Sequence, residues 1–173
     1  MFTVKLAIFV VASCLVVIVS VRRPSRHSPY RLLAWEFLLG LLLLNAGPWF
    51  RDPFSVRQIA SWLLLIASGY LVIEGLRLLR RIGKPRDEVE DTTVLVVVGL
   101  YKYLRHPLYA SLLFLGWGAF LKDPSPLAAV LVVAASAALL VTAKVEEGEN
   151  VKKFGEPYVD YMKRTKMFVP FVL

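Results

Sequence analysis

The chain has 173 residues, of which 57% are hydrophobic, a mean hydropathy of +0.61 and a formal net charge of +8. This composition is too apolar for an ordinary soluble domain of the same length and predicts an integral membrane protein that forms one domain over residues 1–173. The positive charge fits basic loops beside anionic lipid better than nucleic-acid binding. A single cysteine, Cys14, excludes an internal disulfide, and no metal site is expected.

Five hydrophobic segments predict an all-α, polytopic membrane protein with five transmembrane helices. The segments are residues 4–21, 31–50, 56–79, 107–121 and 126–145. A helix needs about 20 apolar residues to cross a hydrocarbon core of about 30 Å. The fourth segment would be only about 22 Å long at 1.5 Å per residue, so we expect a short helix there.

Three connecting segments have a recognisable character. "KDPSP", residues 122–126, predicts a tight turn that joins the fourth and fifth helices as a C-terminal hairpin. "TVLVVVG", residues 93–99, is β-branched and too short to cross the membrane, so we expect it to lie extended against the helices, after the charged turn region of residues 84–93. In the tail, Phe154, Tyr158, Tyr161 and Met162 recur at helical spacing among lysines, which predicts a cytoplasmic amphipathic helix on the inner membrane surface.

Lysine and arginine counts predict the orientation. Alternate sides of the five helices carry 17 and 4 of these residues. Because cytoplasmic loops are enriched in positive residues, the side with 17 should be cytoplasmic. The N-terminus should then lie outside the cell membrane and the C-terminus inside.

Arg105, His106 and Pro107 stand directly before the fourth apolar segment. Proline suits the first turn of a helix, so His106 should lie at its start, near unpaired backbone N–H groups and the positive end of the helix dipole. With the guanidinium of Arg105, this position can bind a carboxylate or a phosphate. The alternative is that Arg105 reaches lipid head groups and His106 caps the helix.

Two pairs of acidic residues also qualify as candidates. Glu146 and Glu147 should lie at the cytoplasmic end of the fifth helix, where the helix dipole disfavours carboxylates, so they need a cation from the protein or from a ligand unless they are simply solvated. Glu36 and Glu74 fall inside apolar segments near the cytoplasmic edge and could face a polar substrate pocket. Simple pairing, such as Glu74 with Arg77 at i+3, is the alternative.

"GLYKYLRHPLY", then "EE" about 40 residues later and "FGEPYVDYMKRT…VP", resembles the isoprenylcysteine carboxyl methyltransferase and phospholipid methyltransferase superfamily. The resemblance covers about residues 94–170 and implies an S-adenosylmethionine-dependent membrane enzyme, with a cofactor-binding catalytic core at 94–173 after N-terminal helices and a loop at 1–93. By this match the catalytic residues would be Arg105 and Glu146, and the cofactor-binding residues Gly99, Tyr101, His106, Tyr109 and Glu147.

The resemblance implies a lipid or lipidated acceptor, such as an isoprenylcysteine carboxylate, and leaves other acceptors open. Asn150 stands where the family often has leucine, and residues 80–91 match only loosely on the side that shapes the substrate site. Arg105 would hold either the cofactor carboxylate or a substrate carboxylate, and either glutamate would face the positive charges of the cofactor. The alternatives are a phospholipid or amine N-methyltransferase, an NADPH-dependent steroid-reductase-like enzyme, and a non-catalytic membrane scaffold.

Overall fold

The computed structural model describes residues 2–22, 26–47, 49–85 and 92–169, and this part of the chain is helical with no β-strand. Its elements are α1 (Phe2–Arg22), α2 (Ser28–Leu44), α3 (Val56–Ile82), the 3-10 helix η1 (Gly99–Lys102), α4 (Pro107–Phe120), α5 (Pro126–Phe154) and α6 (Glu156–Arg164). The all-α prediction is therefore confirmed, and each of the five apolar segments contains one helix.

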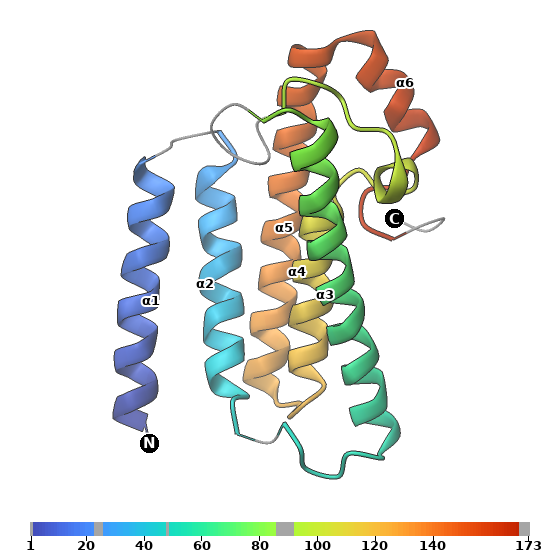
Figure 1. Ribbon diagram of the computed structural model, residues 1–173. Helices are drawn as coiled ribbons and strands as arrows, with labels where there is room; N and C mark the ends of the chain where they lie inside the picture. Colours follow the sequence, from blue (N-terminus) through green and yellow to red (C-terminus); the bar gives the residue numbers. More distant parts are fainter. Residues whose placement is uncertain (1, 23–25, 48, 86–91, 170–173) are drawn as a thin grey trace.

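The first five α-helices run alongside one another as a bundle (Figure 1). α3 packs on α4, α2 packs on α5, and α1 lies at the margin against α2. Leu38, Leu41 and Leu139 are fully buried between the helices, whereas many aliphatic side chains of α1 and α3 are exposed, as expected of a surface that faces lipid. By length and composition, α3 and α5 are each able to cross a membrane.

The end of α2 differs from the prediction. The helix ends at Leu44, six residues before the end of the apolar segment. The next residue, Asn45, turns away from the helix and its side chain donates to the carbonyl oxygens of Ala119, at 2.8 Å, and Asp123, at 3.2 Å. These bonds satisfy a buried amide at the point where α2 ends.

The end of α5 also differs from the prediction, and this difference changes where two candidate site residues lie. α5 continues nine residues beyond the predicted end, to Phe154, because its last turns are rich in glutamate and lysine, which favour helix. It stops at Gly155, whose φ of +67° suits glycine. Glu146 and Glu147 thus lie inside the helix, so the prediction that they stand at its C-terminal end is wrong.

The turn between α4 and α5 is as predicted. The Ser125 hydroxyl accepts from the Ala128 backbone N–H at 3.2 Å and begins α5. Lys122 is buried beside this turn, with its ammonium 3.6 Å from the ring centroid of Trp62 and 2.9 Å from the Gln58 side-chain oxygen. Burial, with repulsion from Arg57, lowers the pKa of Lys122.

The segment before η1 lies on the bundle, as expected, but it is not uniformly extended, since it bends at residues 93, 94 and 98. Residues 92–98 form neither helix nor strand beyond one isolated bridge between Pro85 and Thr92, and Val96 packs with Leu79 and Tyr101. The rest of the predicted charged turn, residues 86–91, lies outside the described residues.

Candidate functional site

The chain before α4 is held by the C-terminal tail. Pro107 is the first residue of α4, and His106 precedes it without making a side-chain cap. The backbone N–H groups of Arg105 and His106 donate to the carbonyl oxygens of Lys166, at 2.8 Å, and Met167, at 3.1 Å. These bonds fix the direction in which the Arg105 and His106 side chains leave the backbone.

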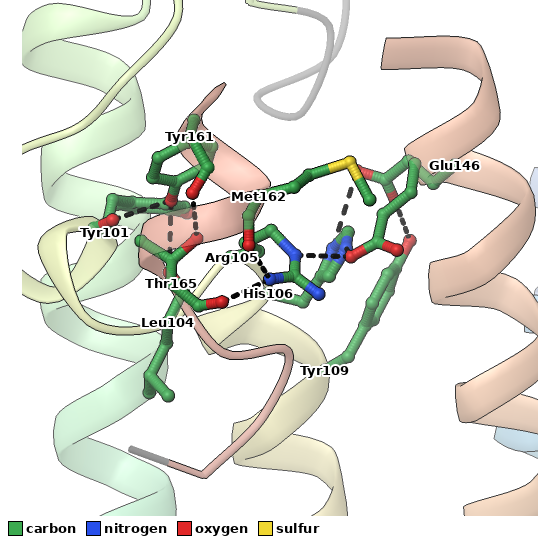
Figure 2. A network of polar contacts seen from close by, with 10 residues as sticks. Tyr101, Leu104, Arg105, His106, Tyr109, Glu146, Tyr161, Met162 and Thr165 are labelled. Carbon is green, nitrogen blue, oxygen red and sulfur yellow. Dashed lines mark hydrogen bonds and ion pairs between the residues drawn. The ribbon is translucent and has the colours of Figure 1, made fainter. Parts of the chain in front are cut away.

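Arg105 points into the protein. Its Nε donates to Glu147 at 2.5 Å, and its Nη1 donates to the carbonyl oxygens of Thr165, at 2.5 Å, and Met162, at 3.2 Å (Figure 2). The side chains of Arg105 and Glu147 are only 11% and 9% exposed. The alternative reading, in which Arg105 reaches lipid head groups, is therefore wrong, because its guanidinium pairs with Glu147.

His106, Tyr109 and Glu146 form the other half of the site. The Tyr109 hydroxyl donates to Glu146 at 2.6 Å, and the Tyr109 ring stacks on the His106 ring with centroids 5.5 Å apart (Figure 2). His106 Nε2 is buried 3.4 Å from a Glu147 oxygen, yet it has no hydrogen-bond partner within the described structure. A buried polar atom of this kind normally binds a ligand or a water molecule.

These side chains line a cavity at the end of the bundle where α6 folds back (Figure 1). The empty space between its walls is about 550 Å³, of which about 60 Å³ admits the centre of a water molecule. Its polar and aromatic lining includes Tyr101, Arg105, His106, Tyr109, Glu146, Asn150, Phe154, Tyr158 and Tyr161. The cavity is thus narrow, partly open, and lined by charged and aromatic side chains.

The contribution of α6 was missed by the sequence analysis. Its amphipathic pattern was recognised, but its apolar face was assigned to the membrane surface. In the structure, Tyr158 and Tyr161 are buried against the protein and face the cavity, and the Tyr161 hydroxyl donates to the Tyr101 carbonyl oxygen at 2.6 Å. Burial raises the pKa of both phenols, so both remain neutral at physiological pH.

The remaining predicted residues lie away from the cavity wall. Gly99 opens η1 with a φ of +60°, and a Cβ added there would lie 2.7 Å from the Leu78 side chain. Glu36 accepts a hydrogen bond from Ser13 at 2.8 Å. Glu74 makes the predicted pair with Arg77, at 3.7 Å. Neither carboxylate lines the cavity, and a substrate role for them stays a prediction.

Comparison with known proteins agrees with the motifs that the cavity brings together. A family profile described as phospholipid methyltransferase matches residues 56–157, which is more than half of the chain and includes Arg105, His106, Tyr109, Glu146 and Glu147. The chain belongs to this family.

Individual relatives include two kinds of methyltransferase. The chain is 22% identical over 170 residues to a methanethiol S-methyltransferase of Pseudomonas sp. (strain GM41(2012)), covering 97% of this chain and 60% of the relative. It is 30% identical over 150 residues to that of Crocosphaera subtropica, covering 83% and 53%. It is also 33% identical over 89 residues to the mouse protein-S-isoprenylcysteine O-methyltransferase, covering 50% and 31%. The chain thus spans little more than half the length of the two bacterial relatives.

Proposed function

We propose that this protein transfers a methyl group from S-adenosylmethionine to a lipophilic, membrane-embedded acceptor, in an O-methylation of the isoprenylcysteine carboxylate type. The observation that carries the proposal is a cavity lined by Arg105, His106 and Glu146. Glu147 pairs with Arg105 beside it, and His106 Nε2 is buried there without a hydrogen-bond partner within the described structure. Family membership supports the reaction class.

The side chains of the cavity fit this cofactor. It carries a carboxylate, an ammonium group, a sulfonium and an adenosine. Arg105, with His106 in the tautomer that carries a hydrogen on Nε2, supplies donors for the carboxylate. Glu146 and Glu147 supply negative charge for the ammonium and sulfonium groups. Tyr101, Phe154 and Tyr158 supply aromatic surface for the adenosine.

The present shape of the cavity implies movement on binding. Only about 60 Å³ of it admits the centre of a water molecule, well below the roughly 300–1,000 Å³ of small-molecule sites. Arg105, which lines the cavity, is held by its contact with Glu147. We expect these two side chains to separate when the ligand binds, with Arg105 keeping its bonds to the backbone carbonyls of Thr165 and Met162.

The proposed methyl transfer requires no proton transfer by the protein. When bound, S-adenosylmethionine would supply a methyl group on a positively charged sulfur, and its transfer to a carboxylate oxygen would break the C–S bond, leave the electron pair on sulfur and move no proton. The protein has to align the acceptor and exclude water. Tyr109 holds Glu146 in one orientation, and the buried aromatic face of α6 closes the cavity.

The same proposal includes the membrane arrangement. We place α1 to α5 across the membrane as a single domain, with the N-terminus outside and the cofactor cavity on the cytoplasmic side. α4, with 14 residues, is about 21 Å long and begins below the inner surface. A soluble cofactor would then enter from the cytoplasm, and a lipophilic acceptor would enter from the bilayer.

S-methylation of a small thiol is the second candidate. It is favoured by the near full-length similarity of this chain to methanethiol S-methyltransferases, since the similarity to the isoprenylcysteine enzyme covers only half of it.

Two measurements test the proposal. In detergent, S-adenosylhomocysteine should raise the thermal unfolding temperature and NADPH should not. Labelled methyl should also pass from the cofactor to a lipophilic acceptor in a membrane extract, with the product identified by mass. Glu146→Gln should reduce both effects. Stabilisation by NADPH alone would reject the proposal, as would stabilisation by neither compound together with no methyl transfer.

A further inference from the structure

Residues 92–103 form one wall of the cofactor cavity, and we call them the wall segment. After α3 the chain turns back and runs down beside that helix to η1 (Figure 1). The side chains of the wall segment that line the cavity are Thr92, Leu95, Val96 and Tyr101. Whatever holds this segment in place therefore also shapes the cavity.

The other side of the wall segment is apolar and exposed. Its outward side chains, each at least 41% exposed, are Val94, Val97, Val98 and Tyr103. Val96, between them in the sequence, is only 4% exposed and faces the cavity. The wall is therefore one chain thick. Grouped apolar side chains of this kind mark a surface that contacts a partner or a membrane.

The contact with α3 places the wall segment beside the last turns of that helix. A Cβ added to Gly99 would lie 2.7 Å from the Leu78 side chain. Leu78 is four residues before the end of α3 at Ile82, or about 6 Å along the helix. In the proposed orientation this is the level of the inner lipid head groups. An irregular backbone is tolerated at that level, where water is present, but not in the hydrocarbon core.

An open hollow on α3 borders the wall segment. Its lining is Glu74, Arg77, Leu78, Arg81 and Ile82. The two arginines lie one helical turn apart and are both exposed, and Leu78 is the residue that Gly99 contacts. The one carboxylate of the hollow pairs with Arg77 at 3.7 Å, so the lining keeps a net positive charge. Guanidinium groups in this arrangement suit a phosphate.

We infer that the wall segment and this hollow bind anionic phospholipid of the inner leaflet, with the phosphate at Arg77 and Arg81 and the exposed valines among the upper acyl carbons. This inference rests on the proposed function and its membrane arrangement. A soluble phosphate compound would leave the apolar patch uncovered, whereas a phospholipid covers the patch and the hollow together. Bound lipid then holds the wall of the cavity, so anionic lipid should raise the affinity for the cofactor.

The position of the wall segment is tested by fluorescence quenching. In a Cys14→Ser variant, Val97→Cys is labelled with the fluorophore NBD, and the protein is placed in nanodiscs whose lipid carries a nitroxide high on the acyl chain. Quenching should be at least half of that at Ile73→Cys, an exposed position within α3, and several-fold above that at Glu156→Cys, an exposed position on α6. Quenching at Val97→Cys no greater than at Glu156→Cys would overturn the inference.

The choice of lipid is tested by calorimetry with S-adenosylhomocysteine, which has no net charge at neutral pH and is not concentrated by a charged surface. Its Kd should be about tenfold lower in nanodiscs with about 30% phosphatidylglycerol than in phosphatidylcholine alone. Arg81→Gln should remove most of this difference, and Arg81→Lys should keep part of it. Arg51→Gln, at an exposed position in the loop at the opposite end of the bundle (Figure 1), should keep all of it. Equal Kd values in the two lipids, or the same gain in Arg81→Gln as in the parent, would overturn the inference.

Two further measurements separate the sources of phosphate and the two proposals. Glycerol phosphate added to phosphatidylcholine nanodiscs should not raise the affinity for S-adenosylhomocysteine; if it does, the hollow is a site for soluble phosphate compounds and the inference fails. Native mass spectrometry should find at least threefold less phosphatidylglycerol retained on Arg81→Gln than on the parent, and equal retention would also overturn the inference. If lipid binding and quenching are as expected but S-adenosylhomocysteine binds in neither lipid and no methyl is transferred, the proposed function is rejected and the lipid contact stands.

Discussion

The buried contact between Arg105 and Glu147 determines the character of the site at the level of single residues. Removing two charges from water costs several kcal/mol each, and their attraction offsets this cost only when the remaining donors are also bonded. Arg105 meets this condition, because its other bonds go to the backbone carbonyls of Thr165 and Met162. The pair therefore joins α5 to the tail, beside the cavity that Arg105 lines.

Removing one partner of this pair should be costly. Glu147→Ala leaves the Arg105 charge buried without its carboxylate, which should lower the free energy of unfolding by about 3 kcal/mol, measured by denaturation in detergent. Glu74→Ala is the matched control: its partner Arg77 is 61% exposed, and the loss should be below about 1 kcal/mol. Equal losses in the two variants would contradict the structural role assigned to Glu147.

A substitution of Tyr109 tests a single side chain of the site with less effect on stability than Glu147→Ala. Tyr109→Phe keeps the ring that stacks on His106 and removes the hydrogen bond to Glu146. A free Glu146 should bind S-adenosylhomocysteine about tenfold more weakly, since one such bond is worth about 1.4 kcal/mol, measured by calorimetry. Tyr103→Phe, at an exposed ring, is the control. Unchanged affinity in Tyr109→Phe would show that the orientation of Glu146 is not needed for binding.

At the scale of elements, α6 matters most. It has nine residues and is too short to be stable alone. Its place depends on Gly155, which turns the chain back, and on the burial of Tyr158 and Tyr161. Tyr161 also ties α6 to the segment around η1, since its hydroxyl donates to the Tyr101 carbonyl. The helix thus closes the cavity by packing on protein.

Loosening α6 should be visible by proteolysis. Tyr161→Phe leaves the Tyr101 carbonyl without its donor, which should cost about 1–2 kcal/mol of local stability. Trypsin should then cut at the exposed residues Lys163 and Arg164 about tenfold faster than in the parent, followed by mass spectrometry. S-adenosylhomocysteine should slow this cleavage in both proteins. If cleavage is equally fast in the parent and the variant, the hydroxyl does not hold α6 in place.

At the scale of the whole molecule, charge and hydrophobicity are separated along the bundle. The 17 lysine and arginine residues of the proposed cytoplasmic side include those near α6, at the end of the bundle opposite the N-terminus (Figure 1). The long apolar helices α3 and α5 connect the two ends. This separation is the basis of the proposed orientation.

Cysteine labelling checks that orientation. In a variant with Cys14→Ser, a cysteine introduced by Asp123→Cys should react with an impermeant maleimide on intact cells, whereas one introduced by Lys163→Cys should react only after permeabilisation. Both positions are exposed, so a difference in reactivity reports their side of the membrane. The reverse pattern would place the cavity outside the cell and contradict the proposed topology.

The sequence by itself determined where the helices begin and which residues are candidates. Local propensity and hydrophobicity determine the effects of the apolar runs, of the proline after His106 and of the Lys122–Pro126 turn, so these features are recognisable from the sequence alone. The same holds for the Glu74–Arg77 pair, whose partners are three residues apart. Tertiary structure decided the rest. The inward direction of Arg105 and the burial of the α6 tyrosines depend on contacts between segments about 40 to 60 residues apart. The open hollow between α1, α2, α3 and α4 depends on the packing of these four helices, since the shape of a space between elements is not encoded in any one of them.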